Sequence, residues 1–144
     1  MNYGSGKLLS TTSLTVSNDR NIESGLNRIW MDVRNNVNGI LGIGLVSRIG
    51  FPISSSFISS EIDDDKCAAM VASVITVADR IGLEFTTIGT FKQSIFTNSE
   101  GFLLFYDIGY DSLLFCIART ESTRLGLVNY VIQQKMPQIK SFLE

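Results

Sequence analysis

The chain has 144 residues, of which 44% are hydrophobic and 18% are charged, with a formal net charge of −2. This is typical of one ordered domain with a full hydrophobic core. The scattered lysines and arginines form no basic cluster that predicts binding to nucleic acid, and the absence of histidine excludes a Ser-His or Cys-His nucleophile pair and a histidine-ligated zinc.

The first 18 residues are rich in serine, threonine, asparagine and glycine and show little hydrophobic periodicity. We expect a flexible N-terminal tail over residues 1–18, followed by a single domain over residues 19–144. The segment lacks the charged start and unbroken apolar core of a signal peptide, and no apolar run reaches the roughly 18–20 residues that cross a bilayer. A cytoplasmic, soluble protein that does not insert into membranes is therefore expected.

A first helix is predicted from about Asp19 to Asn36, and Asn38-Gly39 is expected to end it because both residues tolerate a left-handed backbone. Its apolar residues recur at spacings of three and four and form one stripe, which comprises Ile22, Leu26, Ile29, Trp30 and Val33.

Two strands and a glycine turn follow, over residues 40–48 and 53–58. Gly42 and Gly44 fall on the same face of the first strand, which predicts that another part of the chain packs very close there. Gly50 supplies the positive φ of the turn. Pro52 cannot donate a hydrogen bond to a neighbouring strand, so the second strand is predicted at an edge of the sheet.

A second helix is predicted over residues 64–81, with Asp63 as its N-cap and Gly82 as the residue that ends it. Its apolar residues occupy nearly the whole circumference, so it must be covered on more than one side; they are Cys67, Ala68, Ala69, Met70, Val71, Ala72, Val74, Ile75, Val77 and Ala78. One face can lie on a sheet, and the remainder suits a second subunit.

The three aspartates at positions 63–65 allow a metal site or helix capping as interpretations. No glycine or terminal glutamate follows them at the spacing of a calcium loop. Capping is therefore favoured, and neither a metal nor a cofactor site is predicted.

Three strands are predicted next, over residues 84–97, 101–108 and 113–118, with short polar turns between them. The apolar cores FLLFYDI and LLFCIA are continuous rather than alternating, which indicates a sheet covered on both faces.

A last helix is predicted to begin at Ser122 or Thr123, and Pro137 is expected to interrupt it. The element order α-β-β-α-β-β-β-α thus predicts an α+β fold with a five-stranded antiparallel sheet and helices on both faces. Tyr130 on the last helix, like Trp30 on the first, is expected in the core. Cys67 and Cys116 are expected to be buried free thiols.

This element order, together with three segments, resembles the Roadblock/LC7 family (dynein light chain roadblock type), whose fold is related to that of profilin. The segments are the hairpin with FPIS at 45–55, the small-residue helix at 64–81, and EGFLLFYDIGYDSLLFCIA at 100–118. LGLVNYVIQQ at 125–134 is similar to the last helix of the family.

The chain departs from the family at the first turn. Family members usually have an acidic residue or asparagine before the turn glycine, whereas Ile49 precedes Gly50 here. A β-branched residue resists positive φ, so a turn other than type I′ is predicted.

The resemblance implies a protein that is not an enzyme and has no cofactor. It also implies a dimer, with itself or with a paralogue, in which the central helix and the neighbouring strand pair across a two-fold axis and extend the sheet. Family members bind and regulate small Ras-like GTPases, or act as scaffolds. A non-catalytic dimeric regulator of a small Ras-like GTPase is therefore expected.

Two alternatives remain open. One is a scaffold or adaptor subunit of a motor or membrane-trafficking complex, with no effect on nucleotide state. The other is a small-ligand sensor of the profilin or longin-like kind.

Two sets of candidate residues follow. The candidates for the dimer interface are apolar residues on the central helix and on the strand after it: Met70, Val74, Val77, Phe85, Ile88 and Phe91. The candidates for GTPase binding are polar residues around the central helix, namely Glu61, Lys66, Ser73, Asp79 and Arg80, and for the charged members a solvated surface is the alternative reading. Neither Arg48 nor Arg80 is singled out as an arginine that enters a GTPase site.

Overall fold

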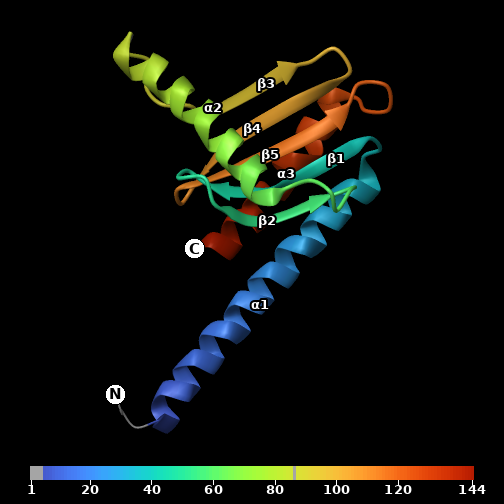
Figure 1. Cartoon of the computed structure of the whole chain (residues 1–144). Helices are drawn as coiled ribbons and strands as arrows, with labels where there is room; N and C mark the ends of the chain where they lie inside the picture. The colour runs from blue at the N-terminus through green and yellow to red at the C-terminus, as the bar shows by residue number, and fades with distance from the viewer. Residues whose placement is uncertain (1–4, 86) are drawn as a thin grey trace.

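The structure, a computed structural model, describes residues 5–85 and 87–144, with residues 5–19 described by their helical backbone. Its elements follow the predicted order (Figure 1). They are α1 (Ser5–Asn36), β1 (Ile40–Ser47), β2 (Pro52–Phe57), α2 (Asp64–Glu84), β3 (Gln93–Thr97), β4 (Gly101–Gly109), β5 (Ser112–Arg119) and α3 (Leu125–Leu143). The predicted fold class is therefore confirmed.

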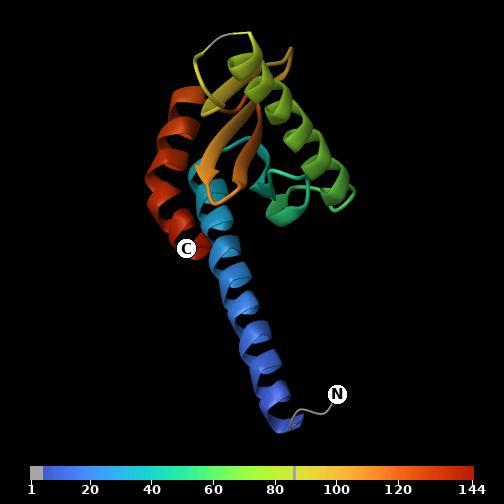
Figure 2. The same ribbon diagram turned by 90° about the vertical axis from the view of Figure 1, so that its left-hand side faces the viewer.

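In the described residues the five strands form one antiparallel sheet in the order β2-β1-β5-β4-β3. α2 crosses one face of this sheet, and α1 and α3 lie on the other (Figures 1 and 2). Leu114 and Cys116 of β5 pack with α1 and α3, whereas Leu113 and Phe115 pack with α2. The continuous apolar strand is thus buried on both faces, as its sequence predicted.

α1 begins at Ser5 rather than at Asp19, so the predicted start of this helix is wrong. Residues 5–18 are helical and extend away from the sheet (Figures 1 and 2). No proline occurs between Gly6 and Asn36 to stop the helix. Residues 1–4 lie outside the described part, and the flexibility of the N-terminal segment stays a prediction.

The predicted burial of Trp30 is confirmed and that of Tyr130 is wrong. Trp30 is fully buried, and its Nε1–H donates to Ser54 Oγ on β2 at 2.9 Å. Tyr130 is 61% exposed. Val128 and Ile132 turn their side of α3 to the core, and a residue midway between them lies on the far side of the helix.

The β1–β2 hairpin packs as the glycines predict. A Cβ on Gly44 would lie 2.5 Å from the carbonyl oxygen of Ser54, so another residue would push β2 away. Gly50 has a φ of +96°, Ile49 keeps a negative φ, and the Gly50 N–H donates to the Ser47 carbonyl at 3.0 Å. The turn therefore differs from type I′, as predicted, and β2 is an edge strand.

Two boundaries after the hairpin differ from the prediction. α2 continues through Gly82 to Glu84, and β3 begins at Gln93 instead of residue 84. Gly82 lies where the backbone folds back on the helix, since a Cβ there would be 2.1 Å from the Gly89 carbonyl oxygen. Gly82 thus serves a close approach rather than a helix end, and Gly89, at a φ of +88°, interrupts extended structure.

A Gly82→Ala substitution should reveal this close approach. Alanine normally stabilises a helix relative to glycine, but here its methyl group would meet the Gly89 backbone. We expect a loss of about 1–3 kcal/mol in the free energy of unfolding, measured by urea denaturation. The matched control is Gly126→Ala on α3, where an added Cβ meets nothing within 4 Å; it should gain about 0.4–1 kcal/mol. Equal effects of the two changes would contradict this account.

The two predicted boundaries of α3 are also wrong. The N-cap is Arg124, which makes no side-chain capping bond, and the Thr123 hydroxyl donates instead to the Asn38 carbonyl at 2.7 Å. Pro137 lies inside the helix. Its missing N–H removes one helical hydrogen bond, but Ile139 is buried and Phe142 packs against the core, which keeps the last turns in place.

The start of α2 is as predicted. Asp63 Oδ1 accepts a hydrogen bond from the Lys66 N–H at 3.1 Å, and Asp64 and Asp65 lie in the first turn. Helix capping therefore accounts for these aspartates. No helix in the described part of the chain combines the length and apolarity needed to span a membrane.

Candidate interaction surface

α2 carries an exposed apolar stripe beside its buried face. Ala68, Val71, Ala72 and Ile75 face the core of the domain. The exposed stripe consists of Met70, Val74, Val77 and Ile81, which are 59%, 39%, 57% and 53% exposed. Their spacing of four, three and four residues aligns them along the helix. Three predicted interface residues therefore lie together, and Ile81, which the sequence interpretation missed, continues their spacing.

The apolar surface continues past the end of α2. Phe85 and Ile88 are 76% and 81% exposed. They lie in the connection between α2 and β3 rather than on a strand as predicted. Phe91 is buried and packs with the core beneath α2, so it is not available to a partner.

An apolar groove of about 320 Å³ lies between the N-terminal half of α2 and the sheet. α2 and the residues before it contribute one wall, and β4 and β5 contribute the other. The lining residues are Ile62, Asp63, Lys66, Cys67, Met70, Val71, Val74, Leu103, Phe105, Phe115 and Ile117.

The two cysteines are both free, but they differ in their surroundings. Cys116 is buried, as predicted, and burial raises its pKa to about 12. Cys67 is only half-buried and lines the groove, where burial and the charge of Asp64 raise the pKa of its thiol. Cys67 is therefore the accessible thiol of the two.

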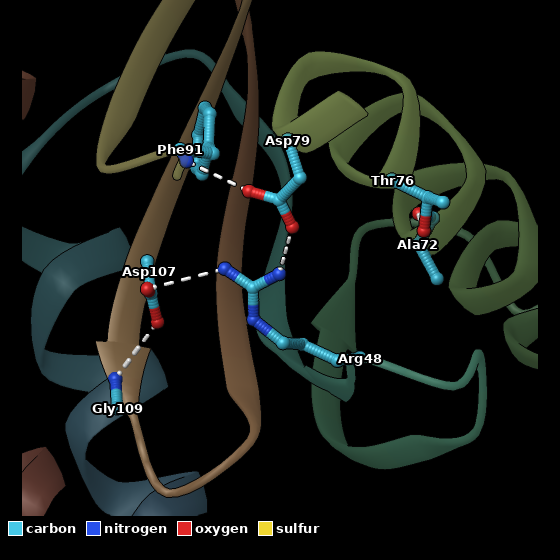
Figure 3. Close-up of polar contacts among 7 residues, drawn as sticks. All are labelled: Arg48, Ala72, Thr76, Asp79, Phe91, Asp107 and Gly109. Carbon is cyan, nitrogen blue, oxygen red and sulfur yellow. Dashed lines mark hydrogen bonds and ion pairs between the residues drawn. The ribbon is translucent and has the colours of Figure 1, made fainter. Parts of the chain in front are cut away.

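A cluster of charged side chains joins the C-terminal half of α2 to the sheet (Figure 3). Arg48, in the β1–β2 turn, donates to Asp79 Oδ2 on α2 and to Asp107 Oδ2 on β4, the latter at 3.1 Å. Asp79 Oδ1 accepts from the Phe91 N–H at 2.7 Å, and Asp107 Oδ1 accepts from the Gly109 N–H at 3.0 Å.

This cluster fixes three parts of the chain relative to one another. Partial burial alone would lower the pKa of Arg48, but hydrogen bonds and charges from Asp79 and Asp107 outweigh it and raise the pKa. The guanidinium is thus held within the domain. Asp79, predicted as a GTPase contact, has its carboxylate engaged in the same cluster.

An Arg48→Met substitution should destabilise the domain by about 1–3 kcal/mol, because two carboxylates that are 16–18% exposed would lose their cation. The free energy of unfolding from urea denaturation, followed by tryptophan fluorescence, measures the effect. The control is Lys135→Met, which removes a more exposed ion pair with Asp32 between α3 and α1 and should cost less than about 1 kcal/mol. A loss no larger for Arg48→Met than for this control would contradict the bracing role.

The remaining GTPase-binding candidates are exposed but do not form one cluster. Glu61 and Lys66 lie at the N-terminal end of α2, while Arg80 lies near its C-terminal end and pairs with Glu84 at 3.4 Å. Ser73 lies between them in a shallow groove of about 560 Å³ against the β1–β2 turn. The other residues lining this groove are Arg48, Ile49, Gly50, Ala69, Ala72 and Thr76.

The chemical character of the surface is that of a binding face. Its principal members are apolar side chains, Asp79 and Arg80 form ion pairs, and Asp63 caps α2. Within residues 5–85 and 87–144, no group of three or more cysteine, aspartate or glutamate side chains could hold a metal ion.

Comparisons with known proteins agree with this architecture. The family model for the Roadblock/LC7 domain matches residues 29–118. Among solved structures, MglB from Myxococcus xanthus is 21% identical with a TM-score of 0.74, and the alignment covers 83% of this chain and 88% of that one. A Roadblock/LC7 domain from Streptomyces avermitilis is 16% identical with a TM-score of 0.71, covering 80% and 94% respectively.

The gliding protein MglB from Thermus thermophilus is 14% identical with a TM-score of 0.73, covering 85% of this chain and 90% of that chain. No curated protein matches the sequence. At these identities the solved structures establish the fold alone, whereas the family model spans more than half of the sequence. The chain therefore belongs to the Roadblock/LC7 family.

Proposed function

We propose that this protein is a non-catalytic, dimeric regulator of a small Ras-like GTPase. Membership of the Roadblock/LC7 family supports the class of function, because members of that family bind and regulate such GTPases. The proposal assigns the protein a binding surface and no reaction of its own.

The observation that carries the proposal is the exposed apolar stripe of α2. Met70, Val74 and Val77, with Phe85 and Ile88 beyond them, would leave a large apolar patch in water on a single chain. Patches of this kind mark interaction sites, and a two-fold axis through the stripe would cover it with the same surface of a second copy. A paralogue with the same stripe would serve equally.

The GTPase would bind the polar positions that such a dimer leaves accessible. Ser73 and Arg80 border the stripe on α2, and Glu61 and Lys66 lie near the start of the helix. A dimer presents each of these positions twice. Regulation would then arise because binding favours one arrangement of the mobile switch segments in the GTPase, which is a population shift in the partner.

The test combines oligomeric state with GTPase kinetics. Light scattering at micromolar concentration should give a dimer. Rates of GTP hydrolysis and nucleotide release should then be measured for Ras-like GTPases, starting with any encoded beside this gene, with and without the protein. A changed rate supports regulation, and Ser73→Arg should reduce that change while keeping the dimer. Binding with unchanged rates would instead indicate the scaffold or adaptor role.

A further inference from the structure

We propose that Phe85 of each copy inserts into the apolar groove of the other copy, beside its Cys67. This inference rests on the proposed dimer and specifies its geometry. It makes the groove between α2 and the sheet a site that is complete only when the second copy supplies a side chain.

The apolar stripe of α2 has a symmetry that suits antiparallel self-packing. Met70 and Ile81 lie equally far from the midpoint between Ile75 and Thr76, and so do Val74 and Val77. A two-fold axis perpendicular to the helix at this midpoint reverses its direction, so Val74 of one copy meets Val77 of the other. Met70 meets Ile81 in the same way, and every apolar position of the stripe finds an apolar counterpart.

The same register brings Phe85 opposite the groove. Counted from that midpoint, Phe85 lies about as far toward the C-terminal end of α2 as Cys67 lies toward the N-terminal end. Cys67 and Met70 line the groove, together with Leu103 and Phe105 from β4. An aromatic side chain buries about 150–250 Å² of surface when it enters an apolar site, and this groove is open, apolar and about 320 Å³ in volume.

The rim of the groove carries both signs of charge, since Asp63 and Lys66 both line it. Lys66 lines the groove next to Cys67, and Glu84 immediately precedes Phe85 on the opposing end of the helix. Insertion of Phe85 therefore brings the Glu84 carboxylate of one copy toward the Lys66 ammonium of the other. Glu84 already pairs with Arg80 of its own chain, and ion pairs at a solvated edge contribute little, so the apolar contacts decide the register.

The backbone of Phe85 is held at the end of α2, where its N–H donates to the Ile81 carbonyl at 3.3 Å. The connection after α2 folds back on the helix through the close approach of Gly82 and Gly89. It is tied down again where the Phe91 N–H donates to Asp79 (Figure 3). Phe85 lies between Gly82 and Gly89 and is 76% exposed. A preformed projection loses little conformational entropy on binding.

Phe85 cannot fill the groove of its own chain. The two positions are separated by nearly the whole of α2, and a helix rises 1.5 Å per residue, so residues 67 and 84 lie roughly 25 Å apart along its axis. A disulfide requires Cα atoms within about 7 Å. Any disulfide between positions 67 and 85 must therefore join two copies.

The test uses this distance and the native thiol. Phe85→Cys in the full chain, oxidised with copper–phenanthroline at pH 9, should give a covalent dimer on a non-reducing gel. Adding Cys67→Ser to this variant should reduce the covalent dimer at least tenfold. Cys116 is buried and should not form a disulfide. Tyr130→Cys, an exposed position on α3, is the matched control and should give no covalent dimer with Cys67.

The outcomes distinguish failure of the Phe85 insertion from failure of the proposed dimer. A covalent dimer that persists in full after Cys67→Ser joins position 85 to its own counterpart instead of Cys67, and it overturns the proposal. A wild-type dimer in light scattering whose Phe85→Cys variant forms no disulfide also overturns the insertion while leaving the proposed dimer intact. A monomeric wild type overturns both. As a second readout, Phe85→Ala should weaken self-association at least about tenfold with an unchanged far-ultraviolet circular dichroism spectrum.

Discussion

Val74→Arg is expected to convert the dimer into a folded monomer. Val74 is 39% exposed on the single chain, so an arginine there can reach water without disturbing the core. In the proposed dimer it lies near the centre of the apolar stripe, and the two-fold axis places two arginines in one interface. A buried charge without a partner costs about 3–5 kcal/mol, which corresponds to a loss in affinity of roughly 150- to 4000-fold.

Sedimentation or light scattering over a range of micromolar concentrations measures this change, and circular dichroism checks that the chain is folded. The matched control is Ser73→Arg, which adds the same side chain to the neighbouring exposed position of the same helix. Ser73→Arg should weaken the dimer far less, because Ser73 borders the stripe on the side of the β1–β2 turn and its arginine can reach water. A Val74→Arg protein that remains a native dimer would contradict the proposed packing of α2.

Trp30→Ala should have the largest effect on stability, a loss of about 3–5 kcal/mol in the free energy of unfolding. The side chain of Trp30 is fully buried between α1 and the sheet, so its removal leaves a large cavity that the sheet and helices can close only in part. The substitution also leaves the Ser54 hydroxyl without the indole N–H that it accepts. Because Trp30 is the only tryptophan, urea denaturation must be followed by circular dichroism.

Ser54→Ala separates the two contributions to this loss. It keeps the indole ring in the core but leaves the buried Nε1–H without its acceptor, which should cost about 1–3 kcal/mol. Trp30→Phe, which fills most of the same space, should fall between wild type and Trp30→Ala. If Trp30→Ala lost less than about 1 kcal/mol, the assignment of Trp30 to the centre of the core would be wrong.

The boundaries that the sequence interpretation missed have a common physical cause. Gly82 has the properties of a helix end, yet it is required for the close approach of Gly89. Pro137 has the properties of a helix break, yet Ile139 packs well enough to keep the helix whole. In both cases a contact made elsewhere in the fold outweighs the local preference of one residue.

Some residues of the candidate site could likewise be predicted from the sequence, and others depend on the fold. Met70, Val74 and Val77 could be found from the sequence because helical spacing alone aligns them. Phe91 could not be placed in this way, because it lies in a connection without regular spacing. The fold buries it beneath α2. The role of Asp79 could not be predicted either, because its ion pair with Arg48 joins residues 31 positions apart.

The sequence by itself determined the order of the elements, the α+β class, the two covered faces of the sheet and the apolar excess of α2. These properties depend on hydrophobic periodicity and on glycine and proline positions, which act over short distances along the chain. Only the tertiary structure decided which apolar residues stay exposed, where the groove beside Cys67 lies and how Arg48 braces α2. Those features depend on contacts between segments distant in sequence, because burial is a property of the assembled core.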